Sequence, residues 1–143
     1  ENLDDYLRTK IWLINFIKTN NINKDYERGL FLHLVTDYIF FNYFFDKDYI
    51  KSIKYNDYKN NLYYSYGLIN DSLEKHYRIT EILKYYEMYD YLEILQSVKG
   101  NGKVKYKKII DLDKLIEFID NISNIDLDKY KEKLIKEGKN VLP

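Results

Sequence analysis

The sequence predicts an all-α protein, a bundle in which several helices pack around one buried central helix at about residues 26–45. Apolar residues recur at steps of three and four along most of the chain, which is the spacing of one helix face. The only proline is Pro143, so no predicted helix contains the residue that most strongly interrupts helices. Strand-like alternation is confined to Val104–Lys107, where at most a short extended segment is expected near 103–107.

The length of the chain predicts its domain organisation. A chain of 143 residues fits one domain of ordinary size and can bury enough surface to fold without disulfide bonds. We therefore expect a single helical domain over residues 1–143. Because the chain starts at Glu1 rather than at a methionine, an upstream segment could be missing from it.

Three helices are expected in the first half of the chain. Residues 2–19 place their apolar side chains on one face, as an amphipathic helix does. An Asn-rich stretch then competes with helix formation, and Asp25 is expected to cap the next helix. That helix, at 26–45, is apolar on every side, which is typical of a buried helix. A third helix is expected at 49–66 and should end at Gly67, because glycine readily adopts the left-handed conformation of a helix cap.

Three more helices are expected in the second half. Residues 79–98 carry apolar side chains mainly at helical spacing, and a glycine-containing loop should follow at 99–103. Asp111 and Asp126 precede further apolar repeats, so each is expected to cap the helix that follows it. The last helix should end at Gly138.

The charge balance and the absence of cysteine exclude several classes of function. Lys and Arg together number 23, as do Asp and Glu, so no net positive charge holds a nucleic-acid backbone and no nucleic acid is expected as a partner. No apolar run approaches the roughly 20 residues of a membrane-spanning helix. No transmembrane span is therefore expected, and the protein should be soluble and, by default, cytoplasmic. Because there is no Cys, a metal would have to be held by His, carboxylate, Tyr or water.

His33 and Asp37 are the residues of the predicted central helix with the clearest chemical potential. They are one helical turn apart, so their side chains share one stripe, and Gly29 one turn earlier leaves room for a close approach. A buried carboxylate is costly unless it is paired or coordinated, so Asp37 needs a partner and His33 is the nearest. Two interpretations remain open: the pair is structural, or it donates two ligands to a metal site that needs three or four.

Two segments resemble a known family. The helix Arg28–Tyr38, of sequence RGLFLHLVTDY, and the following Tyr55–Tyr58, of sequence YNDY, are similar to the helical, zinc-dependent phospholipase C-like proteins of clostridia and related bacteria. In that family a helix with the pattern Gly-Leu-x-x-His-x-x-x-Asp donates metal ligands. The resemblance implies an all-α fold with a polynuclear zinc site that binds a phosphate ester. His33 and Asp37 would then be ligands, and Asp57 a weaker candidate near the site.

The chain departs from that family in its ligand set, and the resemblance covers only about residues 1–66. The family's enzymes use an N-terminal ligand, an upstream Asp and His, and further His and His-x-x-x-Glu ligands, whereas this chain has two His. The second, His76, is followed four positions later by Thr80 rather than by an acid, and its polar surroundings are typical of an exposed residue. Either an upstream segment carries the other ligands, or the site is reduced or lost.

Two functional hypotheses from different classes follow. As an enzyme, the protein would hydrolyse phosphodiesters with a zinc-activated water, and its substrate would be a phosphate ester or a lipid headgroup. As a non-catalytic helical interaction module, it would use the His33–Asp37 pair for structure alone. A tyrosine-rich surface would also suit a homodimer interface, although four clustered tyrosines are interpreted as packing residues: Tyr85, Tyr86, Tyr89 and Tyr91.

Overall fold

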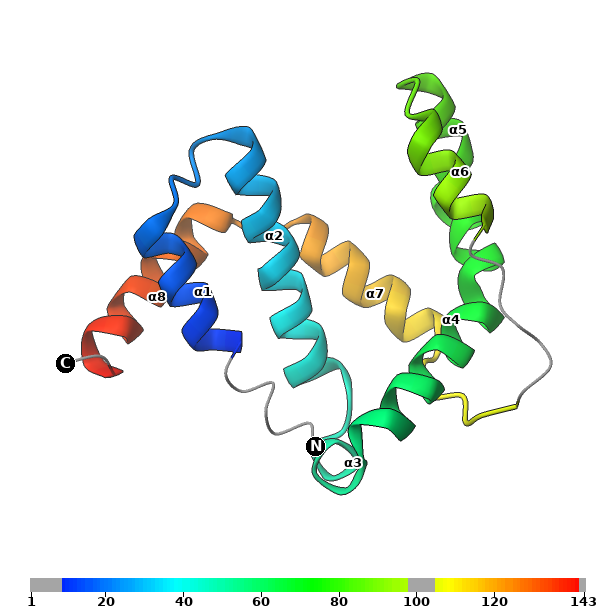
Figure 1. Cartoon of the computed structure of the whole chain (residues 1–143), viewed down its shortest axis with the longest axis horizontal. Coiled ribbons are helices and arrows are strands. Elements are labelled where there is room, and N and C mark those ends of the chain that lie inside the picture. The colour runs from blue at the N-terminus through cyan, green and yellow to red at the C-terminus, as the bar shows by residue number, and fades with distance from the viewer. Residues whose placement is uncertain (1–8, 98–104, 142–143) are drawn as a thin grey trace. The chain divides into compact units, whose positions relative to one another are not determined.

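The computed structural model describes residues 9–97 and 105–141 of the chain. Within these ranges the protein consists of eight α-helices and one π-helical segment, with no β-strand, which confirms the predicted all-α fold class (Figure 1). None of the helices in these ranges combines the length and the apolar character needed to cross a bilayer. Val104 and the loop expected at 99–103 lie outside the described residues.

The helical segments belong to two compact units. In chain order they are α1 (Thr9–Thr19), α2 (Asp25–Ile39), η2 (Phe40–Phe44), α3 (Lys47–Ser52), α4 (Tyr55–Tyr77), α5 (Ile79–Tyr85), α6 (Tyr89–Ser97), α7 (Leu112–Ser123) and α8 (Leu127–Val141). The first unit comprises Glu1–Lys54 and Phe118–Pro143, and the second Tyr55–Glu117. The single domain expected over residues 1–143 stays a prediction, because two compact units of one chain can fold together or separately.

The first unit has a hydrophobic core formed by α1, α2 and α8. α1 packs against both of the other helices. The rings of Phe16 and Phe31 lie parallel, with centroids 6.3 Å apart, so α1 and α2 also share an aromatic pair. The buried core residues are at most 8% exposed: Leu13, Ile14, Ile17, Ile22, Phe31, Val35, Tyr38, Leu127 and Leu134. Of the apolar residues whose spacing predicts the first helix, Leu13, Ile14 and Ile17 are buried and Ile11 is 45% exposed, whereas residues 2–8 of the expected helix lie outside the described residues.

α2 contributes one stripe of side chains to this core. Phe31, Val35 and Tyr38 are buried, and their steps of four and three residues are those of one helix face. By contrast, Leu30 and Leu32 are 38% and 37% exposed. The expectation that this helix is buried on every side is therefore wrong, because a leucine adds apolar character to the sequence whether or not another element covers it.

The end of α2 continues into η2, which is surrounded by aromatic rings. Phe40 is buried, and the centroid of its ring lies 4.8 Å from that of Phe44, 5.1 Å from Phe45 and 5.4 Å from Phe118. Ring contacts at these distances are favourable beyond the area that they bury. They stabilise the helical conformation up to Phe44, which agrees with the predicted extent of the central helix.

In the second unit, α4 runs straight through Gly67, so the predicted helix end at this residue is wrong. Leu62, Ser65 and Ile69 are buried on one face of α4 and lie on both sides of the glycine. Continuous packing of this face outweighs the cost of a glycine in a helix, which is about 1 kcal/mol. The helix expected at 49–66 is also divided in two, since α3 ends and α4 begins within it.

α5 and α6 form a helical hairpin that follows the C-terminal end of α4 (Figure 1). α5 packs against both α4 and α6. The sequence predicts one helix at 79–98, but the structure turns at Glu87, whose φ is 56°. The Met88 N–H donates to the Leu83 carbonyl at 2.8 Å, which closes the turn in the manner of a C-terminal helix cap. Neither glycine nor proline marks this turn, so the break lacks the ordinary sequence signal.

Two of the three predicted aspartate caps are present. Asp111 Oδ2 accepts a hydrogen bond from the Lys114 N–H at 3.2 Å, and Asp126 Oδ1 accepts one from the Lys129 N–H at 3.1 Å. These bonds satisfy donors that the first turn of a helix leaves unpaired. The third prediction is wrong, because Asp25 is the first residue of α2 and the preceding residue makes no side-chain cap.

Gly138 is an interior residue of α8 rather than its end, since the helix continues to Val141. A Cβ at Gly138 would lie 3.1 Å from Cγ2 of Ile14. The absence of a side chain therefore lets α8 approach α1 closely in the core of the first unit. The predicted helix end at this glycine is wrong for that reason.

Two side chains of α4 hold a nonhelical segment between residues 105 and 110. Asn61 Oδ1 accepts a hydrogen bond from the Lys107 N–H at 3.0 Å, and Ser65 Oγ accepts one from the Ile109 N–H at 2.9 Å. The two acceptors are one helical turn apart on α4, and the two donors are two residues apart in the segment. In an extended backbone every second N–H group points the same way, so such a segment can bond to one face of a helix. The short extended segment expected in this region thus bonds to a helix rather than to a strand.

Two tyrosines of the first unit should make its stability fall at alkaline pH. Burial raises the pKa of Tyr130 to about 12, with smaller contributions from Tyr43 and Glu137, and burial also raises the pKa of Tyr38. A tyrosine in an unfolded chain ionises near pH 10. Folding therefore favours the protonated phenol of each tyrosine. The stability that this preference contributes is complete below about pH 10 and is lost as the pH rises towards 12.

We expect the free energy of unfolding, measured by urea denaturation, to fall over this pH range. The fall should be smaller in Tyr130→Phe, because phenylalanine has no proton to lose. Tyr26→Phe is the matched control, since Tyr26 is 75% exposed, and it should keep the slope of the wild type. Equal slopes in all three proteins would contradict the prediction.

Candidate functional site

His33 and Asp37 lie in contact on the exposed side of α2. Nε2 of His33 is 3.3 Å from Oδ2 of Asp37, and the two side chains are 68% and 46% exposed. The one-turn spacing thus brings the pair together, as helix geometry predicts. The expectation that the pair is buried is wrong, because the core side of α2 is the stripe that contains Phe31 and Val35. With water around it, the Asp37 carboxylate does not need a partner to offset desolvation.

Gly29 does not have the role that its position suggests. A Cβ at this residue would meet no atom within 4 Å. The described part of the structure therefore contains no close approach that would require a glycine one turn before His33.

Asp57 and His76 lie at opposite ends of α4, in the second unit. Asp57 is exposed in the first turn, where a carboxylate interacts favourably with the helix dipole. His76 is exposed in the last turn, and its ring meets that of Tyr77 edge-on at 4.7 Å. Of the three residues proposed as metal ligands, the structure brings together His33 and Asp37, whereas Asp57 belongs to the other unit.

The donors that His33 and Asp37 supply do not fit zinc by themselves. Protein zinc sites take three or four protein ligands, and this pair provides two. Among residues 9–97 and 105–141, no group of three or more His, Cys, Asp or Glu side chains is arranged to hold a metal ion. The pair therefore supplies two of the three or four protein ligands that a zinc site takes.

His33→Ala should have little effect on stability. An exposed ion pair one helical turn apart contributes about 0.3–0.5 kcal/mol, and only when the histidine is protonated. We expect the free energy of unfolding, measured by urea denaturation, to change by less than about 0.5 kcal/mol. Asp37→Ala should behave in the same way. A loss of about 3 kcal/mol in either variant would instead indicate a buried pair.

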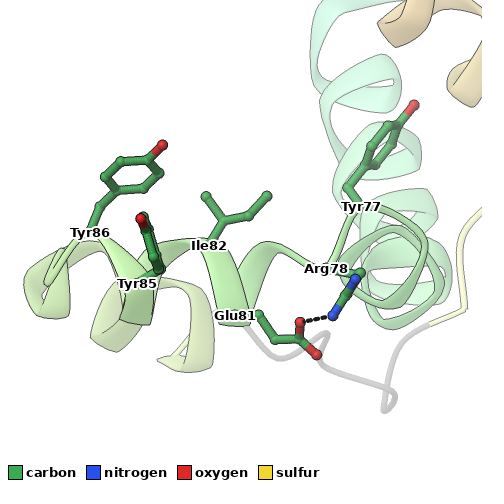
Figure 2. A pocket seen from close by; sticks show the side chains of 6 residues that line it. All are labelled: Tyr77, Arg78, Glu81, Ile82, Tyr85 and Tyr86. Carbon is green, nitrogen blue, oxygen red and sulfur yellow. Dashed lines mark ion pairs between the residues drawn. The ribbon is translucent and has the colours of Figure 1, made fainter.

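A second candidate site is a set of exposed apolar side chains on α5, α6 and the turn between them, which we term the hairpin surface. Its seven large side chains are between 38% and 79% exposed: Ile82, Tyr85, Tyr86, Met88, Tyr89, Tyr91 and Ile94. Figure 2 shows Ile82 and Tyr85 projecting from α5 and Tyr86 projecting from the residue that caps it. The interpretation of the four clustered tyrosines as packing residues is therefore wrong.

A shallow hollow lies at the base of the hairpin surface (Figure 2). Its volume is about 430 Å³, and it is lined by Tyr77, Arg78, Glu81, Ile82, Tyr85 and Tyr86. Arg78 forms an ion pair with Glu81 at one side of the hollow, opposite the apolar and aromatic side chains. Arg78 also has a φ of 55°, so the junction of α4 and α5 adopts a left-handed turn that directs α5 away from the α4 axis.

The turn and α6, from Tyr85 onward, carry charges of one sign, whereas α5 carries both the acidic Glu81 and the basic Lys84. Between Tyr85 and Leu95 the chain contains three acidic residues and no Lys or Arg, and all three acids are exposed: Glu87, Asp90 and Glu93. The surface therefore combines aromatic rings with negative charge. A signal for it exists in the sequence, because tyrosines at positions 85, 86, 89 and 91 cannot share one helix face at 100° per residue, and no single core could cover them all.

Comparison of the chain with protein-family models, with curated proteins and with solved structures gave no match. The resemblance to zinc-dependent phospholipase C-like proteins therefore stays a prediction from the sequence. What the geometry defines is an all-α protein with an exposed, acidic and tyrosine-rich hairpin surface.

Proposed function

We propose that this chain is a non-catalytic helical interaction module that binds a protein partner through the hairpin surface. The observation that carries the proposal is the exposure of seven large apolar side chains on a single helical hairpin. A concentration of large exposed apolar side chains on one pair of helices is typical of interaction sites in proteins, whereas single exposed apolar residues are ordinary.

The composition of the hairpin surface supports a protein as the ligand. Tyrosine contributes a large ring with few rotatable bonds and a hydroxyl that remains compatible with water, so it is enriched at protein interfaces and among the residues that dominate binding energy. The hollow beside Tyr85 and Tyr86 is open and shallow, which suits an inserted side chain of a partner. A small-molecule site, by contrast, is usually an enclosed pocket that buries most of the ligand surface.

Selection from a random peptide library displayed on phage tests this proposal. Peptides selected on the immobilised wild-type chain should lose at least about tenfold in affinity for the variant Tyr85→Ser/Tyr89→Ser/Tyr91→Ser, because exposed aromatic anchors contribute more than 1.4 kcal/mol to binding. The matched control is Tyr26→Ser/Tyr63→Ser, which removes tyrosines that are 75% and 61% exposed but lie outside the hairpin surface. Selected peptides that bind all three proteins equally would contradict the proposal.

The second candidate function is the zinc-dependent phosphodiester hydrolase implied by the family resemblance. One observation favours it, which is the 3.3 Å contact between exposed side chains of His33 and Asp37. Its test is zinc titration by calorimetry together with an assay of phosphodiester hydrolysis. The interaction module predicts that His33→Ala changes neither readout, whereas the hydrolase predicts that His33→Ala reduces both.

A further inference from the structure

We infer that the partner of the hairpin surface is a second copy of this chain, bound through the exposed basic segment Lys105–Lys108. The inference rests on the proposed function, since it names the partner of the same surface. In the resulting dimer the hairpin surface of each copy contacts the basic segment of the other. Both contacts are identical and are related by a two-fold axis, as in most symmetric dimers.

The basic segment is complementary in charge to the hairpin surface. From Gln96 to Ile110 the chain contains five lysines and no acidic residue. Three of these lysines lie in the described part of the chain, at positions 105, 107 and 108, and all three are exposed. They are opposite in sign to the three exposed acids of the turn and α6, which are Glu87, Asp90 and Glu93. Lysine ammonium groups are also attracted to the faces of tyrosine rings, so they suit both components of that surface.

The basic segment is held in place before any partner arrives. The Lys107 and Ile109 N–H groups donate to Asn61 and Ser65 of α4, and Ile110 at its end is 1% exposed. Tyr106 is 45% exposed and adds apolar area to the lysines. A segment that is already ordered loses less conformational entropy on binding than a free tail does.

The two complementary surfaces lie along different parts of α4 within the second unit. The basic segment is bonded to Asn61 and Ser65 in the first half of α4, whereas the hairpin follows Tyr77 at its end (Figure 1). The rise from Ser65 to Tyr77 along a helix is about 18 Å, which is beyond the Debye length of about 8 Å at physiological ionic strength. The points at which the two surfaces join α4 are therefore about two Debye lengths apart along the helix, so neutralisation within one copy is weak.

Two copies with antiparallel α4 helices remove this separation. Each hairpin surface then lies opposite the basic segment of the other copy, and the two-fold axis passes between the α4 helices. Because the contact occurs twice, the dimer covers two hairpin surfaces and two basic segments. Doubling the contact brings the buried area towards the roughly 1,200–2,000 Å² that is typical of stable interfaces.

Charge-reversal variants test the inference by sedimentation equilibrium. The first variant is Glu87→Lys/Asp90→Lys/Glu93→Lys, which carries positive charge on both surfaces. The second is Lys105→Glu/Lys107→Glu/Lys108→Glu, which carries negative charge on both. Each variant alone should be monomeric at concentrations where the wild type is a dimer. An equimolar mixture of the two should form a heterodimer, because every contact in it again joins opposite charges. The wild-type dimer should dissociate in about 1 M NaCl, where the Debye length falls to about 3 Å.

The matched control is Lys129→Glu/Lys133→Glu/Lys136→Glu, which makes the same change in charge at exposed lysines of α8 and should remain dimeric. Circular dichroism verifies that every variant is folded.

A wild type that is monomeric at about 1 mM, or a mixture that contains no heterodimer, overturns the inference. If the wild type is monomeric while peptides selected on it still require Tyr85, Tyr89 and Tyr91, the partner is another protein and the proposed function stands. If the wild type is monomeric and no peptide requires these tyrosines, both fail.

Discussion

Replacing Phe31 with alanine should lower the free energy of unfolding by about 3–5 kcal/mol, the usual cost of removing a buried aromatic ring. Phe31 is 0% exposed in the core of the first unit, and its ring lies parallel to that of Phe16 on α1. The substitution removes the aromatic pair and leaves a cavity between α1 and α2. Because small proteins are stable by only about 5–15 kcal/mol, a loss of this size should be evident in chemical denaturation.

Leu32→Ala is the matched control for this variant. Leu32 is the next residue along α2 and is 37% exposed, so its truncation should cost about 1 kcal/mol or less. The comparison tests whether α2 is buried along one stripe or on every side. Equal losses for the two substitutions would mean that both faces of α2 are covered, and would contradict the one-sided burial described above.

Ser65→Ala should lower the free energy of unfolding by about 1–3 kcal/mol, which is the cost of leaving a buried hydrogen-bonding group without its partner. Ser65 is 0% exposed, and its hydroxyl accepts the Ile109 N–H while donating to the Asn61 carbonyl. Alanine fits the same helical position but offers no acceptor. The Ile109 amide then loses its bond to α4, and the segment before α7 is held less firmly.

Amide hydrogen exchange measures this change at the bond itself. In Ser65→Ala, the Ile109 amide should exchange faster than in the wild type, whereas amides in the core of the first unit should keep their rates. Ser72→Ala replaces an exposed serine on the same helix and should leave both stability and exchange unchanged. Unaltered protection of Ile109 in Ser65→Ala would show that the hydroxyl does not hold the segment.

The parts of the fold that the sequence predicts correctly depend on neighbouring residues. The helical class follows from apolar spacing, and the caps at Asp111 and Asp126 follow from one side chain and the turn beside it. The helix ends at Gly67 and Gly138 are predicted wrongly, because packing on one face of α4 and the close approach of Ile14 decide those positions. The turn at Glu87 depends on how α5 and α6 pack together, which no local pattern indicates.

The same distinction applies to the candidate sites. Contact between His33 and Asp37 follows from their spacing on a helix, but their exposure depends on which elements cover α2, and that is a property of the whole unit. The tyrosines of the hairpin surface are ambiguous for a different reason. A tyrosine ring packs well in a core and also at an interface, so composition alone does not assign Tyr85 or Tyr89 to either environment.

Hydroxyl-radical footprinting of the tyrosines tests the central claim, that the hairpin surface is exposed in the free protein and covered on binding. In dilute protein, Tyr85, Tyr86, Tyr89 and Tyr91 should be modified at rates close to that of Tyr26, which is 75% exposed. Addition of a peptide selected on the wild-type chain should protect these four residues and leave Tyr26 unchanged. Slow modification of the four in the free protein, or equal rates with and without the peptide, would contradict the claim.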